Sequence, residues 1–441
     1  MMDGRGGPKG WHTRRAMLRR TAGAGLALTA LPLAGCTSAA GSAPMSADDW
    51  PYLSAMVARY RSRGMIANML AMIGKGEESL LIGGGTDRLG GQRQSDADSI
   101  YRLYSMTKPI VGMAAMLLVE EGRLSLDQPL AEILPAFANM QVQKEYDGPI
   151  TADNLEPAAR PITIRHLLTH TSGLGYSFVE QGPLSQAMKA AGVVTGLVGP
   201  YPPAELARGT PVTSLTEFAD RLATFPLTHQ PGTQWSYSTG LDVIGRVIEV
   251  VSGQDFESFL ADKIFAPCGM NSTFFRVPED ARSRLTESYD VRGESPVLLD
   301  PAQGTVFAGD DYFPMGGTGL VSSPHDYDRF LHMVANLGEL DGTRILPAAA
   351  VQLGTSDLRP DPSVSLGSWV EGFAFGAAGR LGWAGMDSAY GWAGSAGTVG
   401  FVDMVSGRRC AIYTQYMPAS TWPIAADFEE AIAADLSLQA G

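Results

Sequence analysis

The chain is poor in cysteine, with only Cys36, Cys268 and Cys410 among its 441 residues. Cys268 and Cys410 lie far apart and lack the short Cys/His spacing of zinc ligands, so we expect no metal site. An oxidising compartment would permit a disulfide between these two cysteines, but nothing in the sequence requires one.

Basic residues are also few, because 33 Lys and Arg stand against 46 Asp and Glu, which gives a formal net charge of −13 at pH 7. Proteins that bind nucleic acid use clustered positive charge to displace counterions from the phosphates. We therefore expect no nucleic acid among the partners of this protein.

Apolar runs of bilayer-spanning length, about 20 residues, are absent from the sequence. The apolar stretch Thr21–Ala34 follows a twin-arginine pattern within Thr13–Arg19 and ends in Leu33-Ala34-Gly35-Cys36, which resembles a bacterial lipoprotein cleavage box. Residues 1–36 are therefore predicted to be a Tat-type lipoprotein signal peptide, with Cys36 lipidated after cleavage. The alternative is an ordinary signal peptide cut nearby, with Cys36 incidental.

Export follows from that interpretation. We expect the twin-arginine machinery to deliver the protein to the periplasm or cell envelope, where a lipid on Cys36 would hold it to a membrane. Residues 37–48 are rich in Ser, Ala and Gly and predict a flexible tether. Residues 49–441 are then the folded domain, in which we find no internal repeat.

Strand patterns occur near both ends of this domain. Apolar segments at 65–73 and 79–82 flank Gly74-Lys75-Gly76, and segments at 399–405 and 408–416 flank Ser406-Gly407, so each pair predicts a hairpin. Helical spacing of apolar residues follows at 423–438. The sequence thus predicts an α+β fold, in which both chain ends build one antiparallel sheet and a helical subdomain of about residues 125–325 is inserted.

Two long segments interrupt the inserted region. Residues 138–161 are polar and contain proline, which predicts a surface loop, and residues 192–211 are rich in glycine and proline. Long loops in a compact domain often shape a binding cleft. The alternative is an insertion that has no functional role, which would have the same composition.

The chemistry centres on Ser105 and Lys108, which begin an apolar helix that runs to Glu121. Residues three apart share one face of a helix, so the two side chains are expected to touch. A lysine whose pKa is lowered by burial can take the proton of a serine hydroxyl and make it a nucleophile. The alternative is a helix cap followed by a solvated lysine.

Two further segments provide groups for such a site. Tyr237 lies just before the apolar helix 241–251, where its hydroxyl could act as a base, although many tyrosines in such places are core aromatics. The small residues of 391–398 would let a strand approach a ligand closely, so one exposed N–H of such a strand and the N–H of Ser105 could form an oxyanion hole. A simple glycine-rich turn is the alternative.

Taken together, these motifs resemble the serine β-lactamase and penicillin-binding superfamily, and within it class C β-lactamases and family VIII carboxylesterases. The resemblance covers residues 49–439 and rests on five motifs in order: Ser105-x-x-Lys108, residues 167–174, Tyr237-Ser238-Thr239, residues 316–323 and Trp392-Ala393-Gly394.

The resemblance implies a sheet domain and a helical domain with the site between them. It assigns Ser105 as the nucleophile, gives the general-base work jointly to Lys108 and Tyr237, and places the N–H groups of Ser105 and Ser395 in the oxyanion hole. No cofactor is implied, because an acyl-enzyme route needs none.

Two departures bear on the substrate. Trp392 replaces the lysine of the Lys-Thr-Gly motif, and Thr239 replaces the asparagine of Tyr-x-Asn. Both changes weaken recognition of an anionic substrate, so Trp392, Ala393, Gly394 and Thr239 are expected to line an apolar substrate pocket. We therefore expect a carboxylesterase (EC 3.1.1) acting on a small acyl ester or amide, in preference to EC 3.5.2.

Other functions stay open at this point. A β-lactamase or a D-amino-acid-specific peptidase would use the same residues, and an acylated sensor or binding lipoprotein would need no turnover. A Ser-His-Asp triad has only the near-match Ala393-Gly394-Ser395-Ala396-Gly397 to a nucleophile elbow. Its candidate histidines are His166, His170, His229, His325 and His332; His170 is interpreted as structural.

Overall fold

The computed structural model describes residues 44–204 and 206–440. The predicted signal peptide, with Cys36, lies outside the described residues, and so does most of the predicted tether.

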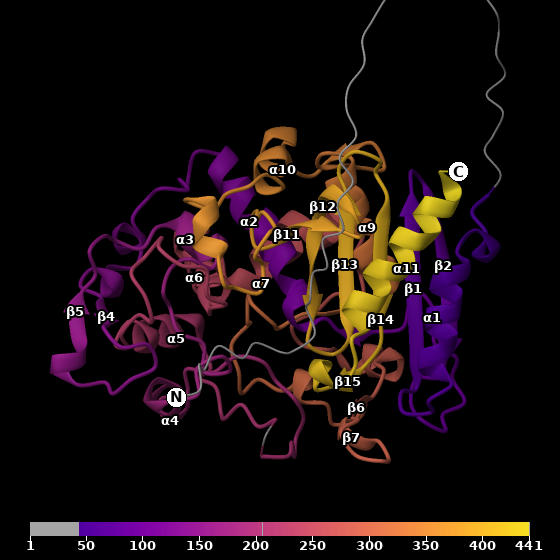
Figure 1. Cartoon of the computed structure of the whole chain (residues 1–441), viewed down its shortest axis with the longest axis horizontal. Coiled ribbons are helices and arrows are strands. Elements are labelled where there is room, and N and C mark those ends of the chain that lie inside the picture. Colours follow the sequence, from indigo (N-terminus) through magenta and orange to yellow (C-terminus); the bar gives the residue numbers. More distant parts are fainter. Residues whose placement is uncertain (1–43, 205, 441) are drawn as a thin grey trace, which may run out of the picture.

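The chain forms a six-stranded antiparallel sheet with helices on both faces and a large, mainly helical part beside it (Figure 1). The helices are α1 Pro51–Arg61, α2 Thr107–Glu120, α3 Ile164–Leu168, α4 Pro183–Ala190, α5 Leu215–Leu222, α6 Gly240–Ser252, α7 Phe256–Leu260, α8 Ala266–Cys268, α9 Pro324–Ala335, α10 Ala348–Gly354 and α11 Ile424–Gln439. The strands are β1 Asn68–Lys75, β2 Glu78–Gly85, β3 Tyr101–Arg102, β4 Gln141–Gln143, β5 Leu155–Pro157, β6 Ser288–Asp290, β7 Val297–Asp300, β8 Val321–Ser322, β9 Glu339–Leu340, β10 Thr343–Arg344, β11 Arg380–Trp383, β12 Met386–Gly394, β13 Thr398–Asp403, β14 Arg409–Tyr413 and β15 Tyr416–Met417.

The main sheet joins the two ends of the domain, as the sequence predicts. Its strand order is β11-β12-β13-β14-β1-β2. The seam is the antiparallel pair β1–β14, in register from Leu70 opposite Tyr413 to Gly74 opposite Arg409. Both predicted hairpins are confirmed as β1–β2 and β13–β14, and the predicted C-terminal helix is α11.

Strand β1 is apolar on both faces because both faces of the sheet are covered. Met69, Ala71 and Ile73 belong to a buried cluster with residues of α1 and α11. Leu70 and Met72 belong to the cluster formed with α2 and α9 on the opposite face. Alternate side chains of a strand point to opposite faces, so this division is what a three-layer arrangement requires.

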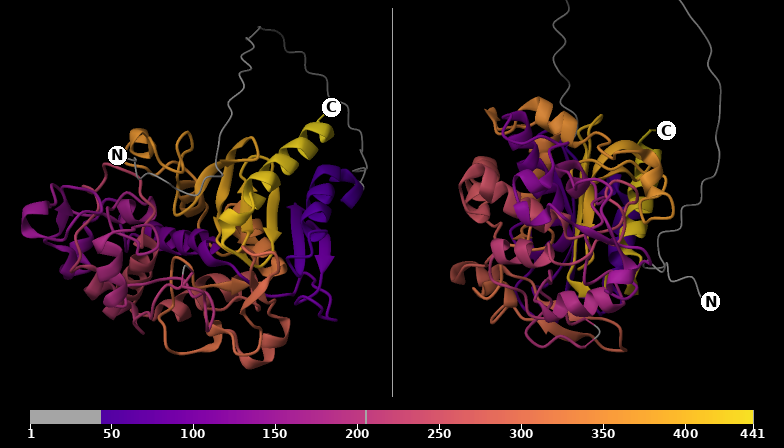
Figure 2. Two further views of the ribbon diagram at one scale, coloured as in Figure 1. Left: turned by 60° about the horizontal axis from the view of Figure 1, so that its bottom comes forward. Right: turned by 90° about the vertical axis from the view of Figure 1, so that its left-hand side faces the viewer.

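The terminal helices α1 and α11 lie together on one face of the sheet (Figure 2). No side chain at the N-terminus of α1 caps the helix. The buried carboxylate of Asp435 in α11 accepts hydrogen bonds from the backbone N–H groups of Tyr52 and Leu53, both at 2.9 Å. The C-terminal helix therefore supplies the cap of the N-terminal one.

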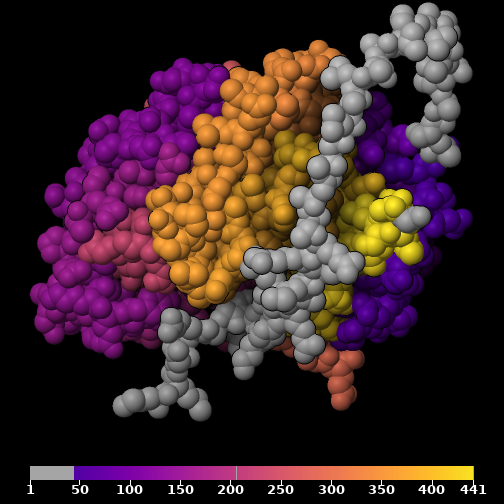
Figure 3. All heavy atoms as spheres, turned by 45° about the horizontal axis from the view of Figure 1, so that its top comes forward, coloured from indigo at the N-terminus to yellow at the C-terminus, as the bar shows by residue number. Residues whose placement is uncertain are grey.

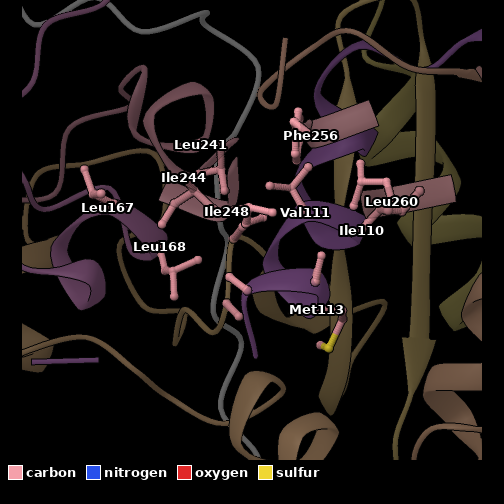
Figure 4. Close-up of a cluster of buried hydrophobic side chains, with 14 of the residues drawn as sticks. Ile110, Val111, Met113, Leu167, Leu168, Leu241, Ile244, Ile248, Phe256 and Leu260 are labelled. Carbon is pink, nitrogen blue, oxygen red and sulfur yellow. The ribbon is translucent and has the colours of Figure 1, made fainter. Parts of the chain in front are cut away.

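Helix α2 joins the sheet to the helical part. It is buried from Thr107 to Leu118 on every face, as expected for a helix that is apolar all round. Figure 4 shows the contact between α2 and the helical part. The side chains labelled there are Ile110, Val111 and Met113 of α2, Leu167 and Leu168 of α3, Leu241, Ile244 and Ile248 of α6, and Phe256 and Leu260 of α7.

The inserted region holds α3 to α8, the two-stranded sheet β4–β5 and the strands β6 and β7, and β15 from the C-terminal end of the chain pairs with β6. The prediction of a plain surface loop for 138–161 is wrong in part, because β4 and β5 pair there over three residues. Such strands are too short to show the alternation on which a sequence-based prediction depends. In the space-filling view, the orange segment that precedes the last strands lies between the helical part and the yellow C-terminal strands (Figure 3).

Within the described residues, no helix combines the length and apolar character needed to cross a membrane. Cys268 and Cys410 are both buried free thiols, so no disulfide joins them. Burial raises the pKa of each thiol to about 12, which leaves both protonated and unreactive.

Candidate active site

The nucleophile candidate lies on a tightly held turn. A short 3-10 turn, Tyr104–Met106, leads directly into α2. The backbone of Leu103 donates to Leu320 O at 2.9 Å, and the Leu320 N–H donates to the Thr107 hydroxyl at 3.1 Å. Both sides of Ser105 are thus fixed to one neighbouring segment, which holds the serine at the N-terminus of α2.

Three predicted residues meet at this point. The Lys108 Nζ lies 3.2 Å from Ser105 Oγ, and the Tyr237 hydroxyl donates to the same Oγ at 2.7 Å. Lys108 also donates to the carbonyl of Gly317 at 2.7 Å and lies 4.5 Å from the centre of the Tyr237 ring. The Ser105 hydroxyl is therefore held between an amine and a phenol, the arrangement needed to activate it.

Burial shifts the pKa values of the two groups beside Ser105, Lys108 and Tyr237, in opposite directions. It lowers the pKa of Lys108 to about 8, against a smaller opposite effect of Tyr176 and Asp242. Burial also raises the pKa of the Tyr237 phenol, while hydrogen bonds with Ser105 and Trp392 act in the other direction. Near neutral pH, a fraction of Lys108 is therefore an uncharged amine able to accept a proton, and Tyr237 is a protonated donor.

Aromatic rings surround Tyr237, whose side chain is buried. The neighbouring rings, with centroid distances to Tyr237, are His170 at 4.7 Å, Trp369 at 5.4 Å, Tyr176 at 5.7 Å, Trp392 at 5.9 Å and Trp235 at 6.1 Å. The Trp392 indole N–H also donates to the Tyr237 oxygen at 3.2 Å. Trp392 is thus a hydrogen-bond donor to Tyr237 in addition to the predicted apolar wall.

Sequence reasoning missed Asp242, which is connected to Lys108 through the backbone of Gly317. Asp242 is 2% exposed, and its Oδ1 accepts the backbone N–H of Gly317 at 3.0 Å. The carbonyl of the same Gly317 accepts a hydrogen bond from Lys108. Burial raises the pKa of Asp242 to about 6. The available signal was an acidic residue in the first turn of α6, among apolar neighbours.

The end of β12 approaches the segment before Ser105. A Cβ atom on Gly394 would lie 2.1 Å from the Leu103 carbonyl oxygen, so only glycine fits there. The Thr398 hydroxyl donates to the same oxygen at 3.3 Å. The turn that contains Ser395 is therefore held next to the Ser105 segment. The oxyanion-hole role of the Ser105 and Ser395 N–H groups stays a prediction, as does the pocket role of Ala393 and Gly394.

Thr239 contributes to the site indirectly. It is 1% exposed, and its hydroxyl donates to the Gly175 carbonyl at 3.0 Å. This bond holds the segment that carries Tyr176 against the start of α6. The hydroxyl of Thr239 thus has a positioning contact within the protein, and its predicted place in the substrate pocket stays a prediction.

His170 is buried in the same cluster, where its Nδ1 accepts the backbone N–H of Ser238 at 3.2 Å. Burial lowers the pKa of His170 well below its usual value, so the ring is neutral. In the described part of the chain, no histidine is hydrogen-bonded to Ser105 or to Ser395. The geometry thus gives no support to a Ser-His-Asp triad.

Comparison with known proteins identifies one matching family model and several relatives, two of which are named as esterases. The family model described as Beta-lactamase matches residues 52–434. Esterase EstB of Burkholderia gladioli is 34% identical over 273 residues, which is 58% of this chain and 62% of that protein. Lovastatin esterase of Penicillium rubens is 33% identical over 288 residues, or 63% of this chain and 65% of that protein. An uncharacterised protein of Mycobacterium tuberculosis is 34% identical over 264 residues, or 60% of this chain and 61% of that protein.

The alignments thus span less than two thirds of the length of each of these relatives. Among solved structures, EstCE1, a hydrolase with promiscuous acyltransferase activity, superposes with a TM-score of 0.70 at 20% identity, covering 88% of this chain and 100% of its own. This likeness establishes the β-lactamase and penicillin-binding-protein fold that the sequence predicts.

Proposed function

This chain belongs to the beta-lactamase family, and we propose that within the family it is a serine hydrolase that cleaves carboxylic esters through an acyl-enzyme. The observation that carries the proposal is the Ser105 hydroxyl, held at hydrogen-bond distance from both Lys108 and Tyr237. A nucleophile, a base with a lowered pKa and a protonated donor are the parts that acyl transfer requires.

In the acylation step, neutral Lys108 accepts the hydroxyl proton of Ser105 while Oγ forms a bond to the ester carbonyl carbon. The negative charge that develops on the carbonyl oxygen would be accepted by the N–H groups of Ser105 and Ser395. When the C–O bond to the alcohol breaks, the alkoxide takes a proton from the Lys108 ammonium, through the Tyr237 hydroxyl.

Deacylation repeats these steps with water. Lys108, neutral again, accepts a proton from a water molecule whose oxygen attacks the acyl carbon. The acyl–Oγ bond then breaks, Ser105 regains its proton, and the carboxylic acid leaves. Tyr237 stays protonated between steps, because burial raises its pKa.

The surroundings of Tyr237 favour esters over β-lactams. The side chain that donates to the Tyr237 oxygen is the uncharged indole of Trp392, so this position provides no ammonium, in addition to that of Lys108, to pair with the carboxylate of a β-lactam. The rings around Tyr237 offer an apolar surface for an acyl or alcohol group. Two of the relatives described above are named as esterases.

Acyl transfer to an alcohol is a second candidate, supported by the same aromatic surface. EstCE1, which shares the fold, is described as a hydrolase with promiscuous acyltransferase activity. An alcohol bound against the rings of Tyr176 and Trp369 would compete with water for the acyl-enzyme. In a test with p-nitrophenyl butyrate and added 1-butanol, transfer would form butyl butyrate, whereas strict hydrolysis would form only butyrate.

The first experiment measures hydrolysis of p-nitrophenyl acetate, p-nitrophenyl butyrate and a chromogenic cephalosporin by residues 49–441. We expect fast ester cleavage, slow cephalosporin turnover and no activity in Ser105→Ala. Ser395→Ala is the matched control, because it removes a hydroxyl but keeps the backbone N–H. Full activity in Ser105→Ala, or loss of activity in Ser395→Ala alone, would refute the assignment.

We propose in addition that the protein is exported by the twin-arginine route and anchored through Cys36, on the motifs within residues 1–36. Metabolic labelling with radioactive palmitate should mark the wild-type chain and leave Cys36→Ala unlabelled. Replacement of Arg14 and Arg15 by lysine should retain the precursor in the cytoplasm. Labelling that persists in Cys36→Ala would contradict the anchor.

A further inference from the structure

The glycine- and proline-rich segment 192–211 borders a cavity of about 580 Å³. Residues from this segment and from 305–315 line it, among them Thr195, Arg208, Thr305, Asp311, Tyr312 and Met315. Asp311 is exposed at its edge. Catalysis as derived above uses no residue of this cavity, yet the cavity contains a cation.

That cation is Arg208. Its guanidinium lies 3.7 Å from the centre of the Phe178 ring, which places it over an aromatic face. Within residues 44–204 and 206–440, Arg208 forms no hydrogen bond or ion pair. A partly buried guanidinium is always charged and presents a planar set of N–H donors that matches a carboxylate. Arg208 lines the cavity and has no protein acceptor in the described part of the chain, so these donors are available to a ligand there.

The cavity cation is close to the catalytic residues. Arg208 interacts electrostatically with Tyr104, the residue before the nucleophile, and with Tyr176. The Tyr176 ring lies 5.7 Å from the Tyr237 ring. Tyr104 is 2% exposed, and its hydroxyl has no hydrogen-bond partner in the described residues. The buried Tyr104 hydroxyl, which has no partner in the described residues, therefore lies within electrostatic range of Arg208.

We propose that Arg208 binds a carboxylate carried by the substrate, so that the preferred substrate is an ester that also bears a carboxylate group. This inference rests on the proposed esterase function and adds its substrate class. The protein has a formal net charge of −13 and would repel an anionic substrate, so a local cation is needed to hold one. The uncharged Trp392 side chain provides no such cation beside Tyr237, whereas segment 192–211 provides Arg208.

The test compares two series of substrates of equal chain length. One series consists of mono-p-nitrophenyl esters of succinate, glutarate, adipate and pimelate, and the other of p-nitrophenyl butyrate, valerate, caproate and heptanoate. We expect kcat/KM for one or two of the dicarboxylate esters to exceed that of their neutral counterparts. In Arg208→Gln this ratio should fall about 10- to 100-fold, because a charge-assisted hydrogen bond is lost.

Three controls separate the outcomes. Arg208→Lys should keep part of the preference, since the charge stays. Arg61→Gln removes an exposed arginine of α1 that forms no ion pair in the described residues, and should leave the ratio unchanged. Neutral-ester hydrolysis by Arg208→Gln shows that the variant is folded.

The inference fails alone if Arg208→Gln lowers both series equally or neither, while Ser105→Ala is inactive. If wild type hydrolyses neither series, the esterase proposal fails. Binding of free glutarate, measured by calorimetry on Ser105→Ala and on Ser105→Ala with Arg208→Gln, then tests the carboxylate site directly. Equal binding by these two variants would overturn it.

Discussion

Replacement of Lys108 by methionine tests whether a buried amine with a lowered pKa occupies the centre of the site. Methionine is a flexible, unbranched side chain that fills a similar space but does not titrate. We expect Lys108→Met to abolish ester hydrolysis, and the free energy of unfolding of the wild type relative to this variant to depend on pH.

The sign follows from proton binding. Lysine has a pKa near 10.5 in the unfolded chain and about 8 in the folded protein, because burial disfavours the ammonium. Between these values the unfolded chain binds more protons at Lys108 than the folded one. The stability that this group contributes therefore rises with pH through that window and is reduced most below pH 8.

The magnitude comes from the same two pKa values. Each unit of pKa difference corresponds to about 1.4 kcal/mol. At pH 7 the shift lowers the free energy of unfolding by about 3 kcal/mol, and at pH 9.5 by about 1 kcal/mol. The difference between wild type and Lys108→Met should thus move by about 2 kcal/mol in favour of wild type as the pH rises.

Urea unfolding of both proteins at pH 7, 8, 9 and 9.5 measures this difference, and titrations common to both proteins cancel. The same pair in an Asp242→Asn background removes any change in the titration of the neighbouring carboxyl. A difference that stays constant within about 0.5 kcal/mol would refute a lowered pKa at Lys108, and with it the role of Lys108 as proton acceptor.

Three further predictions test neighbouring contacts. Trp392→Phe removes the indole donor to the Tyr237 oxygen and should lower kcat about 5-fold, whereas Trp369→Phe, which replaces another ring beside Tyr237, should change kcat little; equal effects would contradict the role of the N–H group. Asp242→Asn keeps an acceptor for its backbone partner but removes the charge that raises the pKa of the active-site lysine. The acidic limb of the kcat/KM profile, expected near pH 8 in wild type, should therefore move to lower pH. A move to higher pH would contradict the stated effect of the Asp242 charge on the pKa of this lysine. Asp435→Ala should lower the free energy of unfolding by about 2 kcal/mol through loss of the α1 cap, while Asp435→Asn, which keeps one acceptor oxygen, should lose about half of that in denaturant unfolding.

Local patterns in the sequence predicted much of the fold. Both hairpins of the main sheet are marked by glycine-containing turns between apolar segments, and α11 by helical spacing. The pairing of β1 with β14 was within reach because strands at both chain ends need partners. The β4–β5 pair was missed, since three residues per strand carry no readable period.

For the site, the sequence predicts the residues of short motifs and misses those that act from a distance. Ser105 and Lys108 are three positions apart, so their contact follows from helix geometry. Asp242 and Lys108 both bind the Gly317 backbone, and Asp242 and Gly317 are 75 residues apart. The Thr239 hydroxyl binds the Gly175 carbonyl, and the neighbouring Tyr176 ring contacts Tyr237. Such contacts depend on tertiary packing and leave no local signal.

Trp392 connects the proposed mechanism with the proposed substrate. An ammonium at this position would lie beside the Tyr237 oxygen, lower the pKa of the phenol and bring a second titrating base into the site. The indole donates a hydrogen bond without a charge, so Tyr237 stays protonated and Lys108 is left as the group that titrates near neutral pH. With an indole in place of an ammonium, position 392 provides no cation for an anionic substrate. Recognition of a carboxylate must then come from another segment, and Arg208 on the 192–211 segment provides the charge without altering the pKa of the phenol that donates to Ser105.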